Sequence, residues 1–124
     1  MNIGFLGLGK LGLPVSLAVE DKGHKIFGYD ISKQTLDDIR NKKIRYREEW
    51  VDKYLPNTKL QINDINQLVK NSEIIFVPIQ TPHDPQYEGI TRIPDKRIDF
   101  DYSYLKAGIK AVSYTHLTLP TTTI

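Results

Sequence analysis

The chain has 124 residues and a mass of 14.3 kDa, which suits one small globular domain and is too short for two. Hydrophobic residues make up 40% and charged residues 26% of the chain, and the formal net charge of +2 is too small to indicate a nucleic-acid or membrane partner. The chain contains no cysteine, which excludes disulfides, thiolate metal sites and thiol nucleophiles within it.

The first thirty residues alternate between apolar strands and a helix. Residues 2–6 and 25–29 are short apolar runs typical of buried strands, and apolar residues at helical spacing lie between them. Pro14 falls in the first turn of this helix, where its missing N–H does no harm, and Gly23 stands where a left-handed residue ends a helix. The pattern predicts strand, helix, strand.

The same alternation continues to about residue 79. We expect helices at residues 32–40, 48–55 and 64–70, the last one capped by Asn63, and strands at residues 59–62 and 73–79. Proline has no N–H to donate to a sheet, so Pro78 favours an end of the last strand at Val77. Strands that alternate with helices predict an α/β fold with a doubly wound parallel sheet.

A long proline-containing segment from Gln80 to Phe100 precedes an expected helix over residues 101–110. Connections of this length in compact domains are usually functional or disordered. Asp84 and Glu88 in this segment are better explained as solvated carboxylates than as a catalytic base. His83 has no partner cluster of the metal-binding type. We therefore assign no catalytic residue and no metal site to this chain.

The composition changes at Ala111, since every lysine, arginine, aspartate and glutamate precedes it. Tyr114 to Leu119 has the residue types of a strand, which could pair with the open edge of the last expected strand. Val112 to Thr121, however, resembles the translation of a transposon-end adaptor used in DNA sequencing libraries, with no mismatch. We therefore expect an incomplete domain over residues 1–111 and a non-native, adaptor-derived tail over residues 112–124.

A glycine-rich motif, GLGKLG, joins the first strand to the first helix. Gly7 permits a tight turn, Gly9 leaves room for a diphosphate, and Gly12 allows the helix to pack closely on the strand. Backbone N–H groups at Lys10 and Leu11 would face the phosphates, together with the partial positive charge of the helix N-terminus. The motif predicts a dinucleotide site.

Asp30 stands at the end of the second expected strand. A carboxylate at this place accepts hydrogen bonds from the adenosine ribose and repels a 2′-phosphate, which predicts NAD and not NADP as the cofactor. A tight structural turn followed by a solvent-facing aspartate is the alternative interpretation of the motif and its acid.

Two segments resemble known dehydrogenases. Residues 3–30, IGFLGLGKLGLPVSLAVEDKGHKIFGYD, resemble the opening of both the nucleotide-sugar and the β-hydroxyacid dehydrogenases. Residues 72–82, SEIIFVPIQTP, look like the fourth strand and Thr-Pro turn of the UDP-glucose/GDP-mannose dehydrogenases. This resemblance implies a Rossmann-like fold, truncated after about four strands, in which Gln80, Thr81 and Pro82 contact NAD.

The resemblance also implies an activity. The intact enzyme would oxidise the C6 alcohol of a nucleotide-linked sugar, such as UDP-glucose, UDP-N-acetylmannosamine or GDP-mannose, to the acid in two NAD-dependent steps. The cysteine, lysine and asparagine that the family uses would lie beyond this chain, so we expect the chain alone to be inactive. The NAD-binding domain of a β-hydroxyacid dehydrogenase and a non-catalytic NAD-binding module are the alternatives.

We expect a cytoplasmic protein without a membrane or nucleic-acid partner. No apolar run reaches the length of about eighteen residues that a membrane helix needs, and no basic start precedes a cleavable apolar stretch. The family resemblance implies a nucleotide-sugar substrate and allows a homo-oligomer of the intact enzyme. Thr35 stands where the family commonly has a basic residue, which leaves the identity of the sugar open.

Overall fold

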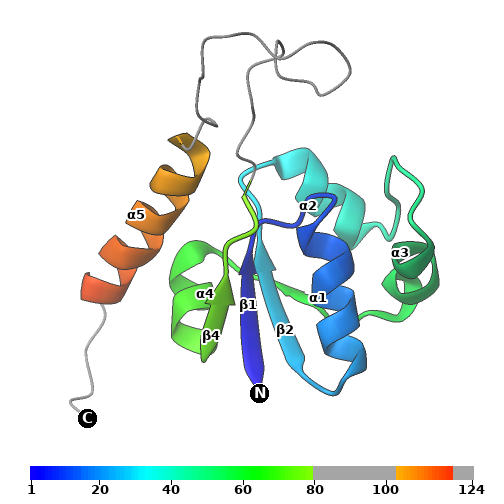
Figure 1. Cartoon of the computed structure of the whole chain (residues 1–124), viewed down its shortest axis with the longest axis horizontal. Helices are drawn as coiled ribbons and strands as arrows, with labels where there is room; N and C mark the ends of the chain where they lie inside the picture. The colour runs from blue at the N-terminus through cyan, green and yellow to red at the C-terminus, as the bar shows by residue number, and fades with distance from the viewer. Residues whose placement is uncertain (80–102, 119–124) are drawn as a thin grey trace, which may run out of the picture.

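The computed structural model describes residues 1–79 and 103–118, and their elements follow the predicted order of strands and helices (Figure 1). They are β1 (Asn2–Leu6), α1 (Gly12–Asp21), β2 (Lys25–Tyr29), α2 (Lys33–Arg40), α3 (Glu49–Tyr54), a 3-10 turn (Leu55–Asn57), β3 (Gln61–Ile62), α4 (Ile65–Asn71), β4 (Ile74–Phe76) and α5 (Ser103–Thr118). The predictions for the segment from Gln80 to Phe100 lie outside the described residues.

The four strands of the described part form one parallel sheet in the order β3-β2-β1-β4. In its central register, Ile3 of β1 lies opposite Ile26 of β2 and Ile74 of β4. The helices α1 and α3 pack together on one face, and α4 packs on the other face beside α5 (Figure 1). The doubly wound α/β fold is confirmed. The chain adds β2 and β3 on one side of β1 and then β4 on the other side, and parallel sheets bind ligands at such a reversal of strand order.

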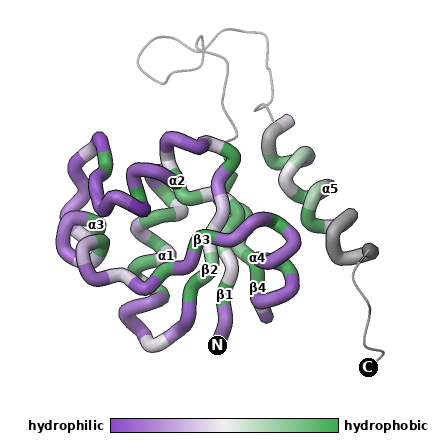
Figure 2. Tube along the Cα trace, turned by 180° about the vertical axis from the view of Figure 1, so that it is seen from behind, coloured by the Kyte–Doolittle hydropathy of each residue, from purple (hydrophilic) through white to green (hydrophobic). Residues whose placement is uncertain are grey.

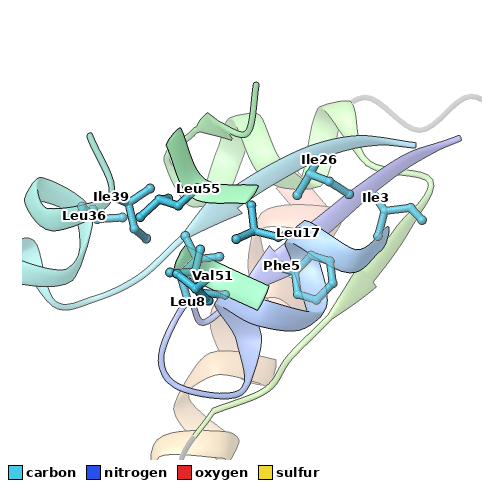
Figure 3. Packing of buried hydrophobic residues seen from close by; sticks show 10 residues of the cluster. Ile3, Phe5, Leu8, Leu17, Ile26, Leu36, Ile39, Val51 and Leu55 are labelled. Atoms are coloured by element: carbon cyan, nitrogen blue, oxygen red, sulfur yellow. The ribbon is translucent and has the colours of Figure 1, made fainter. Parts of the chain in front are cut away.

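The main core lies between α1, α3 and the sheet. Phe5, Ile26, Leu17 and Val51 are almost completely buried there, and Figure 3 shows their side chains packed together. Figure 2 shows the corresponding hydropathy, with apolar residues along the strands and hydrophilic residues over most of α2 and α3. Leu8, in the glycine motif, belongs to the same core, so the motif is anchored to the body of the domain.

The N-cap of α4 differs from the sequence prediction. Asp64 caps this helix, and not Asn63, because its carboxylate accepts a hydrogen bond of 2.8 Å from the N–H of Gln67. The Gln67 side chain accepts a bond of 3.1 Å from the N–H of Asp64 in return. Such a reciprocal capping box satisfies two donors that a helix start leaves unpaired, which favours Asp64 over its neighbour.

The last helix also differs from its prediction. α5 continues to Thr118, beyond the expected end at Lys110, and its backbone is helical over residues 114–118, where the alternative was a strand. The strand alternative is therefore wrong. Extending an existing helix fixes one residue for each new hydrogen bond, which is easier than starting a helix, and the next proline is Pro120. A Cβ at Gly108 would overlap the Ile79 side chain, so α5 approaches the end of β4 closely.

Among the described residues, β4 lies at one edge of the sheet, and two of its apolar side chains are partly exposed. Ile74 is 43% and Phe76 is 47% exposed. An open apolar edge is a template for pairing with another chain, so we expect the 124-residue chain to self-associate at micromolar concentration.

Replacing Ile74 with lysine should shift the chain toward monomer, because an edge lysine opposes strand pairing. Light scattering or sedimentation velocity measures this shift. The matched control is Gln61→Lys on β3, the opposite edge strand, which should leave the association unchanged. A wild-type chain that is monomeric at the same concentration would contradict the prediction.

Candidate functional site

The glycine motif forms a tight turn between β1 and α1. Gly7 has a φ of 124°, a left-handed conformation that favours glycine, and its N–H donates a 2.8 Å hydrogen bond to the carbonyl of Tyr29. A Cβ on Gly7 would lie 3.0 Å from the carbonyl oxygen of Pro78. The turn is therefore held between the carboxyl ends of β2 and β4, and the tight turn expected at Gly7 is present.

The other two glycines of the motif have different surroundings. A Cβ on Gly12 would overlap the carbonyl oxygen of Gly7 and lie 3.0 Å from the Pro78 ring, so this position has no room for a side chain. A Cβ on Gly9 would meet no described atom within 4 Å. Gly12 is thus required for packing, whereas Gly9 leaves an open space beside the backbone.

The start of α1 offers unpaired hydrogen-bond donors next to that space. Leu11, the N-cap, makes no side-chain capping bond, and the N–H of Leu13 donates to the carbonyl of Gly9 at 3.0 Å. Within the described part of the chain, the N–H groups of Gly9, Lys10 and Leu11 have no hydrogen-bond partner. Together with the partial positive charge of a helix N-terminus, these donors suit an anionic group such as a phosphate.

Asp30 is fixed beside the glycine motif by two hydrogen bonds. One carboxylate oxygen accepts from the N–H of Leu8 at 2.8 Å, and the other accepts from the N–H of Ser32 at 2.8 Å. The side chain is therefore held by the loop and does not simply face solvent. Each carboxylate oxygen has a second lone pair, so Asp30 can still accept hydrogen bonds from the hydroxyls of a ribose.

Two features of the site were missed by the sequence reasoning. Ile31 directly follows Asp30 and is 91% exposed, which places an apolar surface next to the carboxylate. Gly28 faces the Leu8 side chain, and a Cβ there would lie 2.8 Å from a Leu8 methyl carbon. Ile31 could have been found from the sequence, because it is an apolar residue directly after Asp30. Nothing in the sequence indicated that Gly28 lies against Leu8.

Six of the predicted cofactor residues lie together at the carboxyl ends of β1 and β2, namely Gly7, Gly9, Lys10, Leu11, Gly12 and Asp30. The other three, Gln80, Thr81 and Pro82, lie outside the described residues. Their neighbour Ile79 is described and follows Pro78, which would crowd a side chain at Gly7 or Gly12.

Two further observations concern only the described ranges, 1–79 and 103–118. They hold no group of three or more metal-ligating side chains. They also contain no helix with the length and apolar character of a membrane span.

Comparison with known proteins gives consistent matches over nearly the whole chain. Residues 1–118 match the UDP-glucose/GDP-mannose dehydrogenase family, NAD binding domain. UDP-N-acetyl-D-mannosamine dehydrogenase of Pyrococcus horikoshii is 28% identical over 117 residues, which are 91% of this chain and 25% of that protein.

Solved structures agree with this match. The structure of UDP-D-ManNAc dehydrogenase from Pyrococcus horikoshii has a TM-score of 0.70 at 27% identity, covering 93% of this chain and 26% of that one. GDP-mannose dehydrogenase from Pseudomonas aeruginosa has a TM-score of 0.72 at 22% identity, covering 93% of this chain and 25% of that one, which shows a common fold. The chain spans about a quarter of the length of these relatives.

Proposed function

The chain belongs to the UDP-glucose/GDP-mannose dehydrogenase family as its NAD-binding domain, and from this membership we propose that it serves an NAD-dependent nucleotide-sugar 6-dehydrogenase. The intact enzyme oxidises the C6 alcohol of a nucleotide-linked sugar to the acid. Membership of this family also disfavours the β-hydroxyacid dehydrogenase alternative, which residues 3–30 alone left open. A nucleotide sugar is accordingly the substrate partner of the intact enzyme.

The open space at Gly9, bordered by unpaired N–H groups, is the observation that carries the proposal. We assign the cofactor diphosphate to the N–H groups of Lys10 and Leu11, and the adenosine ribose to Asp30. Ile31 supplies an apolar surface for the adenine ring beside that ribose. Bound NAD supplies the hydride acceptor of the oxidation, while these residues bind and orient it. Residues 80–82 complete the contacts by resemblance.

We further propose that residues 1–111 are the native, incomplete domain and that residues 112–124 derive from a sequencing adaptor. The match of ten consecutive residues to the translated adaptor supports this division. Sequencing the source locus tests it. A reading frame that continues past Lys110 into a glycine-rich cysteine motif is the expected result, and it would also exclude a non-catalytic NAD-binding module. A natural stop codon near Lys110 would contradict the proposal.

We propose the cytoplasm as the location of the intact protein, because NAD and nucleotide sugars are available there. A homo-oligomer is the assembly that we propose for the intact enzyme by resemblance to its family. Size-exclusion chromatography of the complete protein tests the assembly.

The proposed cofactor is tested by calorimetric titration with NAD and NADP of the Ile74→Lys variant, which should be monomeric. We expect NAD to bind at least about tenfold more tightly, because the Asp30 carboxylate repels a 2′-phosphate. Gly9→Val, which fills the space at Gly9, is the non-binding control. NADP binding as tight as NAD binding would contradict the assignment of Asp30.

The activity is tested by following NADH absorbance with UDP-glucose, UDP-N-acetylmannosamine or GDP-mannose. The complete reading frame should produce NADH with one of them. The 124-residue chain should produce none, because we assign it no base for the first oxidation step and it has no thiol for the second. Sustained NADH production by the chain, above the Gly9→Val control, would show that the chemistry lies within these residues.

A further inference from the structure

A cavity of about 360 Å³ lies directly beside the glycine motif. Gly9 and Lys10 form one side of it, Thr35 and Asp38 of α2 form another, and Arg45 and Tyr46 also line it. This last segment lies outside the glycine motif, in the connection between α2 and α3. The cavity therefore adds side chains from a distant part of the chain to the proposed diphosphate site.

The exposed Lys10 side chain lies over an aromatic ring at this cavity. Its ammonium nitrogen lies 5.8 Å from the centroid of the Tyr46 ring, a distance at which a cation is attracted to the ring face. Lys10 has no salt bridge within the described residues, whereas Arg45 is paired with Asp38 at 3.4 Å. Of the two cations that line the cavity, Lys10 and Arg45, only Lys10 has no ion pair with a described carboxylate.

Tyr46 remains neutral and so does not offset this charge. Burial and, to a smaller extent, the nearby Glu48 carboxylate raise the pKa of its hydroxyl above the usual value. A neutral ring keeps its attraction for the ammonium group without forming an ion pair. The Lys10 charge is therefore available to an anion that occupies the space at Gly9.

We propose that the Lys10 ammonium group, positioned by the Tyr46 ring, binds the cofactor diphosphate from the cavity side. This inference rests on the proposed function, because it assumes a diphosphate at the Gly9 space. It adds a side-chain contact to the backbone N–H groups of the same motif. Lys10 is the binding residue, and Tyr46 is a positioning residue that acts through it.

The test is calorimetric titration of the 124-residue chain with NAD and, separately, with inorganic pyrophosphate, with every variant made in the Ile74→Lys background that should keep the chain monomeric. We expect Lys10→Gln to weaken both ligands about five- to tenfold and to reduce the salt dependence of binding, since an exposed charge contact is screened by salt. The matched control is Lys25→Gln. Lys25 also lies over a ring, 5.4 Å from the centroid of Phe27, but at the opposite end of β2.

The role of Tyr46 is tested by two variants. Tyr46→Phe keeps the ring and should preserve wild-type affinity, whereas Tyr46→Leu should weaken both ligands about threefold because the ammonium group loses its platform. Circular dichroism checks that each variant is folded.

The outcomes separate this inference from the proposed function. Equal affinities for Lys10→Gln and Lys25→Gln would overturn the contact while leaving NAD binding intact. Pyrophosphate binding that depends on Lys10, in a chain that does not bind NAD, would overturn the proposed cofactor and support the contact. Tyr46→Phe binding as weakly as Tyr46→Leu would refute the positioning role of the ring.

Discussion

Gly12→Ala is expected to destabilise the chain by about 3 kcal/mol, because overpacking at a rigid position costs about that much. The new Cβ would overlap the Gly7 carbonyl oxygen, which belongs to the turn itself. It would also lie 3.0 Å from the Pro78 ring. A backbone atom in a tight turn cannot yield as the end of a flexible side chain can. Urea denaturation followed by circular dichroism measures the loss.

Gly9→Ala is the matched control within the same motif. No described atom lies within 4 Å of its new Cβ, and Gly9 lacks a left-handed φ, so stability should change by less than about 0.5 kcal/mol. The methyl group enters the space proposed for the diphosphate, so NAD affinity should fall at least about tenfold, a loss of about 1.4 kcal/mol. Equal stability losses in the two variants would contradict the different roles assigned to these glycines.

Asp30→Ala should lower both the stability of the chain and its affinity for NAD. The substitution removes the acceptors of the Leu8 and Ser32 N–H bonds, both 2.8 Å long. Hydrogen bonds to charged groups contribute about 1.5–3 kcal/mol each when buried, and the partial exposure of this site lowers the expected total to about 2–3 kcal/mol. Loss of the ribose contact should weaken NAD ten- to hundredfold, that is by about 1.4–2.8 kcal/mol.

The control for Asp30 is Asp21→Ala, which makes the same charge change at the far end of α1, on an exposed side chain. It should alter neither NAD affinity nor stability by more than about 0.5 kcal/mol. Unchanged NAD affinity in Asp30→Ala would refute the ribose assignment, whereas unchanged stability would show that the two backbone bonds are replaced by water.

Much of the architecture was predictable because its signals are local. Apolar runs determined where β1 and β2 lie, and the period of α1 was visible between them. Gly23, expected as a left-handed residue after α1, has a φ of 98°. Alternating strands and helices then allow few arrangements other than a parallel sheet with helices on both faces. The glycine motif and Asp30 were recognisable for the same reason, because a dinucleotide site is indicated by the order of strand, glycines, helix, strand and acid along the chain.

The tertiary structure decided what depends on contacts between distant residues. The three motif glycines look alike in sequence. Only the structure shows that Gly7 and Pro78 leave no room for a side chain at Gly12, whereas Gly9 has open space beside it. The Asp30 carboxylate meets the Leu8 N–H across 22 residues.

The place of Lys10 above the Tyr46 ring joins the glycine motif to a connection beyond α2. Such contacts are set by how the strands and helices pack in three dimensions, which a one-dimensional pattern of residue types does not encode.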